Sequence, residues 1–278
     1  MLLANAIAAY VTDRQARGEI TAATATQFAW RLNLLARAHP GLEVAELTRD
    51  RVLEWQRTIG DQRPATRRGY LSALKTFSAW AIDNGLLVAD PTLRLAKVRD
   101  SRSVPRTLSA GRMARLLMAL PDERARLIVL LMCQCGLRCI EVARLQVSDW
   151  DSSVAELRVI GKGGHVREAQ VLDDLAVLLE RRCAGRTGPL VGISAERISY
   201  LVSTWMDQAG IKTGPYDGIS AHALRHTAAS NLLDGCGNVR LVQEFLDHIS
   251  LATTERYLRR HSKHEIRAAM LKSARLTG

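Results

Sequence analysis

The segment SAHALRHTAASNLL, residues 220–233, places two histidines and an arginine among alanine, leucine and small hydroxyl residues. If Ser220 caps a helix, His222 and Arg225 share one helical face, three residues apart. The neighbouring face is an apolar stripe of Ala221, Leu224, Ala228 and Leu232. A guanidinium fork beside an imidazole binds a metal poorly and a phosphate well. The segment therefore predicts a phosphate site, and we assign the adjacent His226 to packing.

Two further cations fit such a site. In CGLRCIEVARL, Gly136 permits a sharp entry into a short helix that begins near Arg138. Glu141 follows three residues later, close enough to orient or neutralise Arg138. Lys162 lies in the glycine-rich stretch GKGG, where a flexible ammonium could reach a leaving oxygen. Taken singly, Arg138 and Glu141 are better explained as a structural ion pair, and Lys162 as an ordinary solvated lysine.

The segment LDHISLATTERYLRR, which begins at Leu246, contains His248 and Tyr257. A tyrosine in such a helix usually packs against its neighbours. Its hydroxyl, with an ordinary pKa of about 10, is a weak nucleophile at neutral pH and needs nearby cations or a base to attack. The sequence supplies both kinds of group.

The elements that would position these groups are mainly helical. In the first 96 residues, apolar periodicity predicts helices over residues 2–17, 22–38, 48–58 and 63–83. The last of these has one buried stripe, formed by Tyr70, Leu74, Phe77 and Ala81. Three cations lie off that stripe: Arg67, Arg68 and Lys75. They are either a solvated face or contacts to phosphate.

A basic linker over residues 97–107 lacks apolar periodicity and carries Arg102 and Arg106. The following residues, 108–278, are mainly helical with one interruption. There ELRVI and HVREAQV, residues 156–160 and 165–171, predict a β-hairpin with Lys162 in its turn. The later helices are predicted over residues 173–183, 195–208, 220–234, 239–247, 251–260 and 263–274.

The composition favours a soluble protein that binds nucleic acid. Lysine and arginine number 39 against 28 acidic residues, and the net charge of +11 is typical of a protein that binds a polyanion. No apolar run is long enough to span a bilayer, and the N-terminus lacks the basic region of a secretory signal. We therefore expect a cytoplasmic protein with no membrane partner. The trio CQCGLRC has the spacing of no common zinc site, so we expect buried thiols and no metal.

Taken together, these motifs are similar to those of the tyrosine site-specific DNA recombinases, the family of phage integrases and Xer-type recombinases. GLRCIE resembles the first arginine box of that family, HALRHT its second, and DHISLATTERY the segment that ends in the nucleophile. The resemblance covers essentially the whole chain. It implies a helical, SAM-like core-binding domain in residues 1–96, a linker in 97–107, and a mixed α/β catalytic domain with a small β-hairpin or sheet in 108–278.

The resemblance also implies a chemical step that needs no cofactor and no metal. Tyr257 would attack the scissile phosphate, forming a covalent 3′-phosphotyrosyl enzyme and releasing a 5′-hydroxyl, so that rejoining requires no ATP. Arg138 and Arg225 would stabilise the non-bridging oxygens as charge develops, with Glu141 orienting Arg138.

Three further roles follow from the same resemblance. Lys162 would be the general acid that protonates the 5′ oxygen, His222 would serve the proton transfer of the tyrosine, and His248 would hydrogen-bond the phosphate. The sequence departs from the family in two places. Asp247 stands where glycine is most common, which puts the contact of His248 with phosphate in doubt, and YLRR follows the nucleophile where YTH is commoner.

As partners, the resemblance implies double-stranded DNA with an inverted-repeat core, a homotetramer on that DNA, and an accessory directionality factor. The candidates for contact with DNA are Arg67, Arg68, Lys75, Arg102 and Arg106. Because the chain starts at the core-binding domain, we expect no arm-binding domain, which fits an Xer-type enzyme as well as a minimal phage or mobile-element integrase. We favour the integrase, which integrates DNA such as a viral genome, because YLRR departs from the usual Xer form. The alternatives are an Xer-type dimer-resolving recombinase, a catalytically silent DNA-binding regulator, and a type IB topoisomerase.

Overall fold

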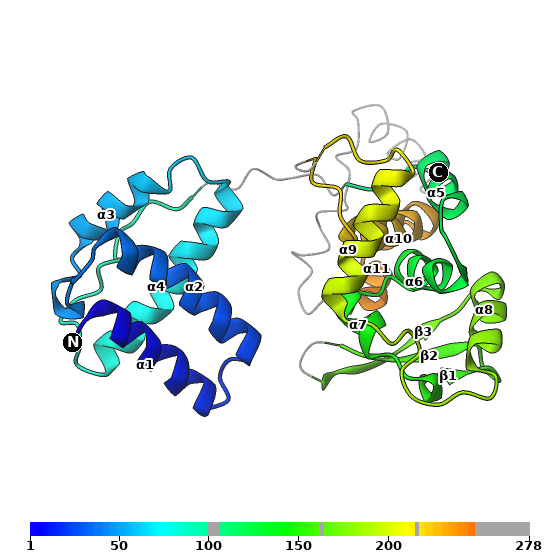
Figure 1. Cartoon of the computed structure of the whole chain (residues 1–278), viewed down its shortest axis with the longest axis horizontal. Coiled ribbons are helices and arrows are strands. Elements are labelled where there is room, and N and C mark those ends of the chain that lie inside the picture. The colour runs from blue at the N-terminus through cyan, green and yellow to red at the C-terminus, as the bar shows by residue number, and fades with distance from the viewer. Residues whose placement is uncertain (99–105, 162–163, 215–216, 248–278) are drawn as a thin grey trace, which may run out of the picture. The chain divides into compact units, whose positions relative to one another are not determined.

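The computed structural model describes residues 1–98, 106–161, 164–214 and 217–247. The chain divides into two compact units, Met1–Arg102 and Ser103–Gly278, and each unit has its own hydrophobic core (Figure 1). The prediction of a mainly helical fold with a small sheet is confirmed. The two helices predicted after residue 250 lie outside the described residues.

The first unit is built from helices whose ends follow from local sequence. Thr21 and Thr48 precede α2 and α3, and each side chain accepts a hydrogen bond from a backbone N–H of the first turn. Pro64 begins α4, where its missing N–H costs nothing. The helices lie within two residues of their predicted spans, at α1 Leu3–Ala16, α2 Ala22–Ala38, α3 Arg49–Thr58 and α4 Pro64–Asp83, with a 3₁₀ turn at Val44–Glu46.

The predicted stripe of α4 is the centre of the first core. Tyr70, Leu74, Phe77 and Ala81 are all buried, and α1 and α2 pack against this helix. Tyr10 of α1 stands with its ring edge against Phe77, at 5.6 Å between ring centroids. The apolar stripe of α4 is therefore buried, as its helical spacing predicts.

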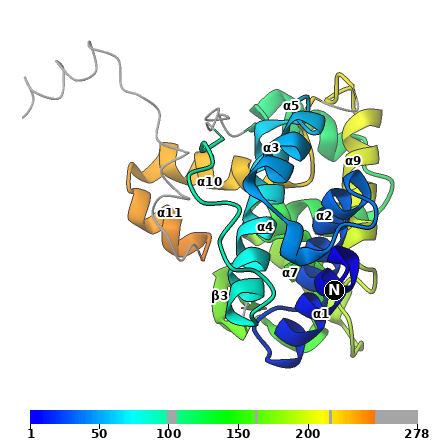
Figure 2. The same cartoon turned by 90° about the vertical axis from the view of Figure 1, so that its left-hand side faces the viewer.

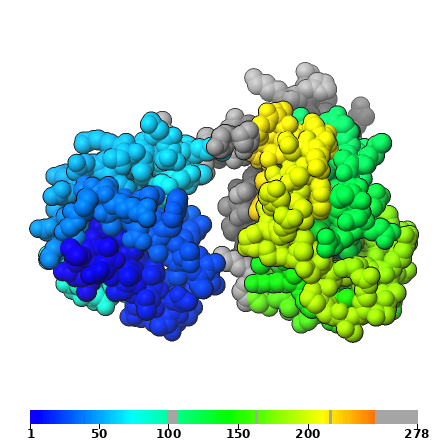
Figure 3. Space-filling view, viewed as in Figure 1, coloured from blue at the N-terminus to red at the C-terminus, as the bar shows by residue number. Residues whose placement is uncertain are grey.

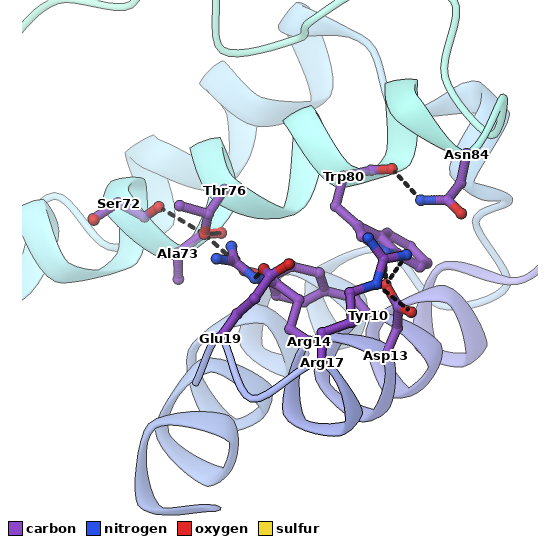
Figure 4. Close-up of polar contacts among 10 residues, drawn as sticks. All are labelled: Tyr10, Asp13, Arg14, Arg17, Glu19, Ser72, Ala73, Thr76, Trp80 and Asn84. Carbon is purple, nitrogen blue, oxygen red and sulfur yellow. Dashed lines mark hydrogen bonds and ion pairs between the residues drawn. The ribbon is translucent and has the colours of Figure 1, made fainter. Parts of the chain in front are cut away.

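Polar contacts complete the contact between α1 and α4 (Figure 4). The hydroxyl of Tyr10 donates a hydrogen bond of 2.8 Å to Thr76 Oγ1. Trp80 Nε1 donates one of 2.7 Å to Asp13 Oδ2, and Arg17 Nε donates to the other oxygen of Asp13 at 3.0 Å. The ring of Tyr10 is buried and that of Trp80 partly buried, and the polar atom of each is hydrogen-bonded, which fixes the relation of the two helices.

The second unit is organised around a helix that is buried on all sides. Residues 127–132 of α6 are all buried, which explains the apolar run LIVLLM, and α7, α8 and α10 pack against this helix. The elements of the unit are α5 Ala110–Met118, α6 Glu123–Cys133, α7 Cys139–Arg144, a 3₁₀ turn at Val147–Asp149, β1 Trp150–Asp151, β2 Glu156–Ile160, β3 Val166–Gln170, α8 Asp173–Cys183, α9 Ala195–Gln208, α10 His222–Cys236 and α11 Val239–Phe245.

The sheet of this unit is antiparallel with the order β1-β2-β3. The predicted hairpin corresponds to β2 and β3, in a register that pairs Leu157 with Ala169 and Val159 with Arg167. Strand β1 was not predicted, because two residues are too few to show an alternation of apolar and polar side chains. Gly161, which follows β2, lies close to Asp247, as described below.

Helices α9, α10 and α11 surround the region of the predicted phosphate site. Figure 2 shows α10 and α11 side by side, and a small cluster of Ala229, Val242 and Leu246 joins them. Helix α9 packs against α7 and forms much of the face of this unit in Figure 3. Within the described residues, no helix is both long enough and apolar enough to cross a membrane.

Two predicted helix ends in this region are wrong. Helix α10 begins at His222, Ala221 occupies the capping position, and the side chain of Ser220 makes no capping bond. Helix α11 ends at Phe245 and not at Asp247, because Asp247 adopts the left-handed backbone conformation with φ of 49°. A left-handed residue cannot continue a right-handed helix.

Candidate active site

Arg138 is held at the start of α7 by its own backbone and by Glu141. The Arg138 N–H donates a hydrogen bond of 2.9 Å to Glu141 Oε2, and Arg138 Nη1 lies 2.5 Å from Glu141 Oε1. The same glutamate therefore caps the helix and pairs with the guanidinium, as the three-residue spacing predicts. About a third of the Arg138 side chain stays accessible, at 29% exposure.

Glu141 pairs with more cations than Arg138 alone. Its side chain is only 2% exposed, and Oε2 lies 3.6 Å from Arg225 Nη1 and 3.7 Å from Arg167 Nη2. Three guanidinium groups from α7, β3 and α10 thus meet one buried carboxylate. A buried charge is stable only when it is paired, so the arginines and the glutamate hold one another in place.

Arg225 is the most buried of these cations, at 4% exposure. Its Nη1 donates a hydrogen bond to the carbonyl oxygen of Gly136, and its Nη2 donates to that of Leu246. The sequence predicted that Arg225 shares a helical face with His222, but the pattern did not indicate that Arg225 is buried. The guanidinium lies inside the unit, where it links the turn before α7 to the end of α11.

His222 lies at the exposed first turn of α10 and close to both arginines. Partial desolvation, together with the positive charges of Arg225 and Arg138, lowers the pKa of His222 below its ordinary value. At neutral pH the imidazole is consequently neutral and can accept a proton. His226 lies one turn further, with 6.5 Å between the two ring centroids.

The end of α11 is fitted tightly to two glycines. A Cβ atom at Gly136 would lie 2.8 Å from Phe245 Cε1, and one at Gly161 would lie 2.9 Å from Asp247 Oδ2. Gly136 also has a φ of +64°, which favours glycine. The residues just before His248 therefore lie against the turn before α7 and against Gly161 at the end of β2.

The thiols of CQCGLRC are packed into the unit. Cys135 is buried, Cys133 and Cys139 are half-buried, and all three are free. Burial raises the pKa of Cys133 and of Cys135 to about 12, so that both stay protonated at neutral pH. These side chains therefore act as small apolar groups near the arginine cluster.

The remaining predicted residues fall into two groups. Lys162, His248, Tyr257 and Arg102 lie outside the described residues. The other candidates for contact with DNA lie on the surface of their own units: Arg67 and Arg68 are half-buried on α4, Lys75 is exposed on the same helix, and Arg106 is exposed against Gly218.

One member of the cluster, Arg167, was not predicted from the sequence. It lies on β3, two residues before the buried Ala169, and its side chain is 13% exposed. Alternation along HVREAQV places Arg167 on the same inward face as Ala169. An arginine on the buried face of a strand was the signal that could have identified it.

The described part of the site can bind an anion. Three cations and one carboxylate leave two positive charges in excess, and the neutral His222 lies beside them. Arginine forks on rigid elements suit the non-bridging oxygens of a phosphate, especially as negative charge develops on them. Within the described residues, no cluster of histidine, cysteine or acidic side chains is arranged to hold a metal ion.

Comparisons with known sequences agree with this chemistry. The family model described as "Phage integrase family" matches residues 106–264. Tyrosine recombinase XerC of Rhodospirillum centenum is 35% identical over 216 residues, which cover 72% of this chain and 63% of that protein, slightly less than two thirds of its length. Tyrosine recombinase XerC of Mycobacterium sp. (strain KMS) is 33% identical over 242 residues, covering 78% of this chain and 80% of that protein.

Solved structures share the fold at low sequence identity. The Tn1549 transposon integrase, in complex with transposon right end DNA, superposes with a TM-score of 0.79 at 16% identity and covers 99% of this chain and 100% of that one. A lambda integrase dimer bound to a COC′ core site gives 0.77 at 16% identity, covering 95% and 100%. With the sequence matches and the arginine cluster, these findings show that the chain belongs to the phage integrase family of tyrosine recombinases.

Proposed function

We propose that this protein cuts and rejoins DNA at specific sites through a covalent 3′-phosphotyrosyl intermediate, as the integrase of a phage or another mobile element. The observation that carries the proposal is the convergence of Arg138 and Arg225 on the buried carboxylate of Glu141. The carboxylate holds the guanidinium groups of Arg138 and Arg225 in fixed places, and preorganised cations are what electrostatic stabilisation of a transition state requires.

The proposed reaction balances without any cofactor. The oxygen of Tyr257 attacks the phosphorus, its proton passes to the neutral His222, and the bond from phosphorus to the 5′ oxygen breaks. Lys162 protonates that oxygen as it leaves, while His248 donates a hydrogen bond to the phosphate. The phosphodiester energy remains in the phosphotyrosyl bond, so the reverse attack by a 5′-hydroxyl restores the DNA.

His222 supports this division of roles. Its lowered pKa makes it a proton acceptor at neutral pH, whereas Arg138 and Arg225 stay charged and cannot accept a proton. The nearness of an acceptor to two permanent cations supports the proposed phosphate site. A site that only bound DNA would gain nothing from an imidazole kept neutral.

The proposed partner is double-stranded DNA with an inverted-repeat core, on which four copies of the protein assemble. The excess of 39 basic over 28 acidic residues supports binding to a polyanion. Arg67, Arg68, Lys75, Arg102 and Arg106 are the proposed contacts to phosphates outside the catalytic cluster. Contacts of this type position a protein on DNA and make its affinity depend on salt.

A trap for covalent adducts tests the proposal. The purified protein is incubated with fragmented source DNA and quenched in detergent, and the protein-bound ends are recovered and sequenced. Tyr257→Phe removes the proposed nucleophile. Tyr200→Phe is the matched control, because it removes the hydroxyl of a tyrosine that is 60% exposed on α9.

The expected result is adducts at one inverted-repeat site with the wild type and with Tyr200→Phe, and none with Tyr257→Phe. Adducts scattered without sequence preference would indicate a topoisomerase instead. A wild-type protein that binds DNA but forms no adducts would contradict the proposal and favour a catalytically silent regulator.

An Xer-type role is the second candidate, because the relatives at 33–35% identity are XerC recombinases. The recovered site separates the two roles. An integrase is expected to give adducts at the junction of a mobile element and its target, whereas a dimer-resolving enzyme gives them at a site repeated in direct orientation on a circular dimer. Recombination between two plasmids or within one, each carrying the recovered site, measures the preference directly.

A further inference from the structure

Arg167 belongs to the arginine cluster although no motif identifies it. It is the second residue of β3, paired in register with Val159 of β2, and it follows Lys162 by five residues. Its Nη2 lies 3.7 Å from Glu141 Oε2, and its side chain is 13% exposed. The hairpin thus reaches the carboxylate that holds the two proposed catalytic arginines.

The two oxygens of Glu141 are divided among the three cations. Oε1 pairs with Arg138 at 2.5 Å, whereas Oε2 lies at almost equal distances from Arg225 and Arg167, 3.6 and 3.7 Å. Arg225 also has firm partners in two backbone carbonyls. Oε2 therefore attracts two guanidinium groups. That of Arg225 is already held by backbone carbonyls, and that of Arg167 extends from strand β3.

The ion pair with Glu141 leaves buried donors of Arg167 without a hydrogen bond within the described residues. Its Nε and Nη2 are buried and have no hydrogen-bond acceptor there, although a buried guanidinium normally satisfies its donors. A hydrophobic residue would fill the same inward position of β3 at lower cost. Its charge also reaches the neighbouring Cys135, whose thiol pKa it lowers against the larger effect of burial.

We infer that Arg167 is a positioning residue that sets the place of Arg225 and Arg138 through the carboxylate they share. The inference rests on the proposed function. Without Arg167, Arg225 would be the only guanidinium near Glu141 Oε2, which also accepts a hydrogen bond from the Arg138 backbone N–H. The carboxylate would then draw Arg225 toward itself and away from the position proposed for the phosphate. With Arg167 present, the carboxylate is also held from the side of the hairpin, and the guanidinium groups of Arg138 and Arg225 keep their places relative to each other.

The variants Arg167→Gln and Arg167→Lys test this role. Arg167→Gln removes the charge, whereas Arg167→Lys keeps it and loses the planar fork. The matched control is Arg158→Gln on the neighbouring strand β2, because Arg158 is 56% exposed and only loosely paired with Asp149 at 3.8 Å. The readouts are the single-turnover rate of covalent cleavage, the affinity for the same DNA, and the urea midpoint of unfolding.

Arg167→Gln is expected to lower the cleavage rate roughly tenfold to a hundredfold, the effect of a small misplacement of catalytic groups, with little change in DNA affinity. Arg167→Lys should recover part of the rate, and Arg158→Gln should cleave like the wild type. Cleavage by Arg167→Gln at the wild-type rate would overturn the inference. A parallel loss of affinity and rate would also overturn it, because it would indicate a simple contact to DNA.

A double-mutant cycle with Glu141→Gln separates this inference from the proposed function. If Arg167 acts through Glu141, its substitution changes the cleavage rate and the urea midpoint much less in the Glu141→Gln background than in the wild type. Strictly additive shifts of the midpoint would contradict the inference without any use of DNA. A wild-type protein that forms no adducts would contradict the proposed function instead.

Discussion

The guanidinium of Arg225 donates a hydrogen bond to the backbone carbonyl of Gly136, which lies 89 residues earlier in the chain. A second bond from the same guanidinium reaches the carbonyl of Leu246, the residue after the last turn of α11. One buried side chain therefore joins the turn that presents Arg138 to the segment that leads to His248 and Tyr257. Changes on either side of this connection should affect the whole site.

Gly136→Ala is expected to destabilise the protein more than Gly185→Ala. Both glycines have a φ of +64°, so each alanine should lower the free energy of unfolding by about 1–2 kcal/mol through the left-handed conformation. At Gly136 the new methyl group would also lie 2.8 Å from Phe245 Cε1, while nothing lies within 4 Å at Gly185. Overpacking adds about 1–3 kcal/mol to the loss of unfolding free energy, measured in urea. Equal losses would show that Phe245 moves aside freely.

Glu141→Gln is expected to lower the free energy of unfolding by about 3–5 kcal/mol, because three guanidinium groups lose their buried counter-charge. Glu123→Gln is the control. Its carboxylate pairs with Arg181 at 2.9 Å, but both side chains are more than 60% exposed, so the loss should stay below about 1 kcal/mol. If urea unfolding gave the two variants similar stability, Glu141 would not be the charge that holds the cluster together.

His222→Gln is expected to flatten the dependence of stability on pH. The pKa of His222 is lowered in the folded protein, so the unfolded chain binds a proton more readily. The wild type should therefore lose stability as the pH falls through the unfolded value of about 6.5, and the loss should stop growing below the folded-state pKa. Urea denaturation from about pH 7.5 to about pH 5 measures the difference between the two proteins. Parallel curves would mean that His222 has the same pKa in both states.

Asp247→Ala is expected to be less stable than Asp247→Asn. Asp247 has a φ of 49°, and asparagine tolerates this conformation better than alanine does. The difference in unfolding free energy should be about 1 kcal/mol, with Asp247→Gly at least as stable as Asp247→Asn. A similar stability of the alanine and glycine variants would show that the segment relaxes out of the left-handed conformation.

Lys162→Ala is expected to slow the cleavage of normal DNA by roughly 10²–10⁴-fold, the usual contribution of a general acid. The same variant should cleave a substrate with sulfur in place of the 5′ bridging oxygen at close to the wild-type rate, because a thiolate leaves without a proton. His165→Ala, in the same hairpin, is the control and should cleave both substrates normally. Slow cleavage of both substrates by Lys162→Ala would assign the lysine another role.

The close agreement of the helices with prediction comes from signals that are local. Proline at the first position of α4 and threonine before α2 and α3 predict helix starts independently of the tertiary structure. The start of α10 was missed because Ser220 looks like a cap but makes no capping bond. The end of α11 was missed because Asp247 adopts a left-handed backbone conformation. That conformation is usual for glycine, so an aspartate at this position does not predict it.

The candidate site divides in the same way. The types and spacing of His222 and Arg225 predicted a phosphate site. Together with the motifs that contain Arg138, Lys162 and Tyr257, they indicated the family by resemblance. The sequence alone determined which reactive groups the site contains, because each group belongs to a particular amino acid at a particular position. Only the tertiary structure decided that Arg225 is buried against two carbonyls and that Arg167 joins Glu141, because such contacts depend on how β3, α7 and α10 pack together.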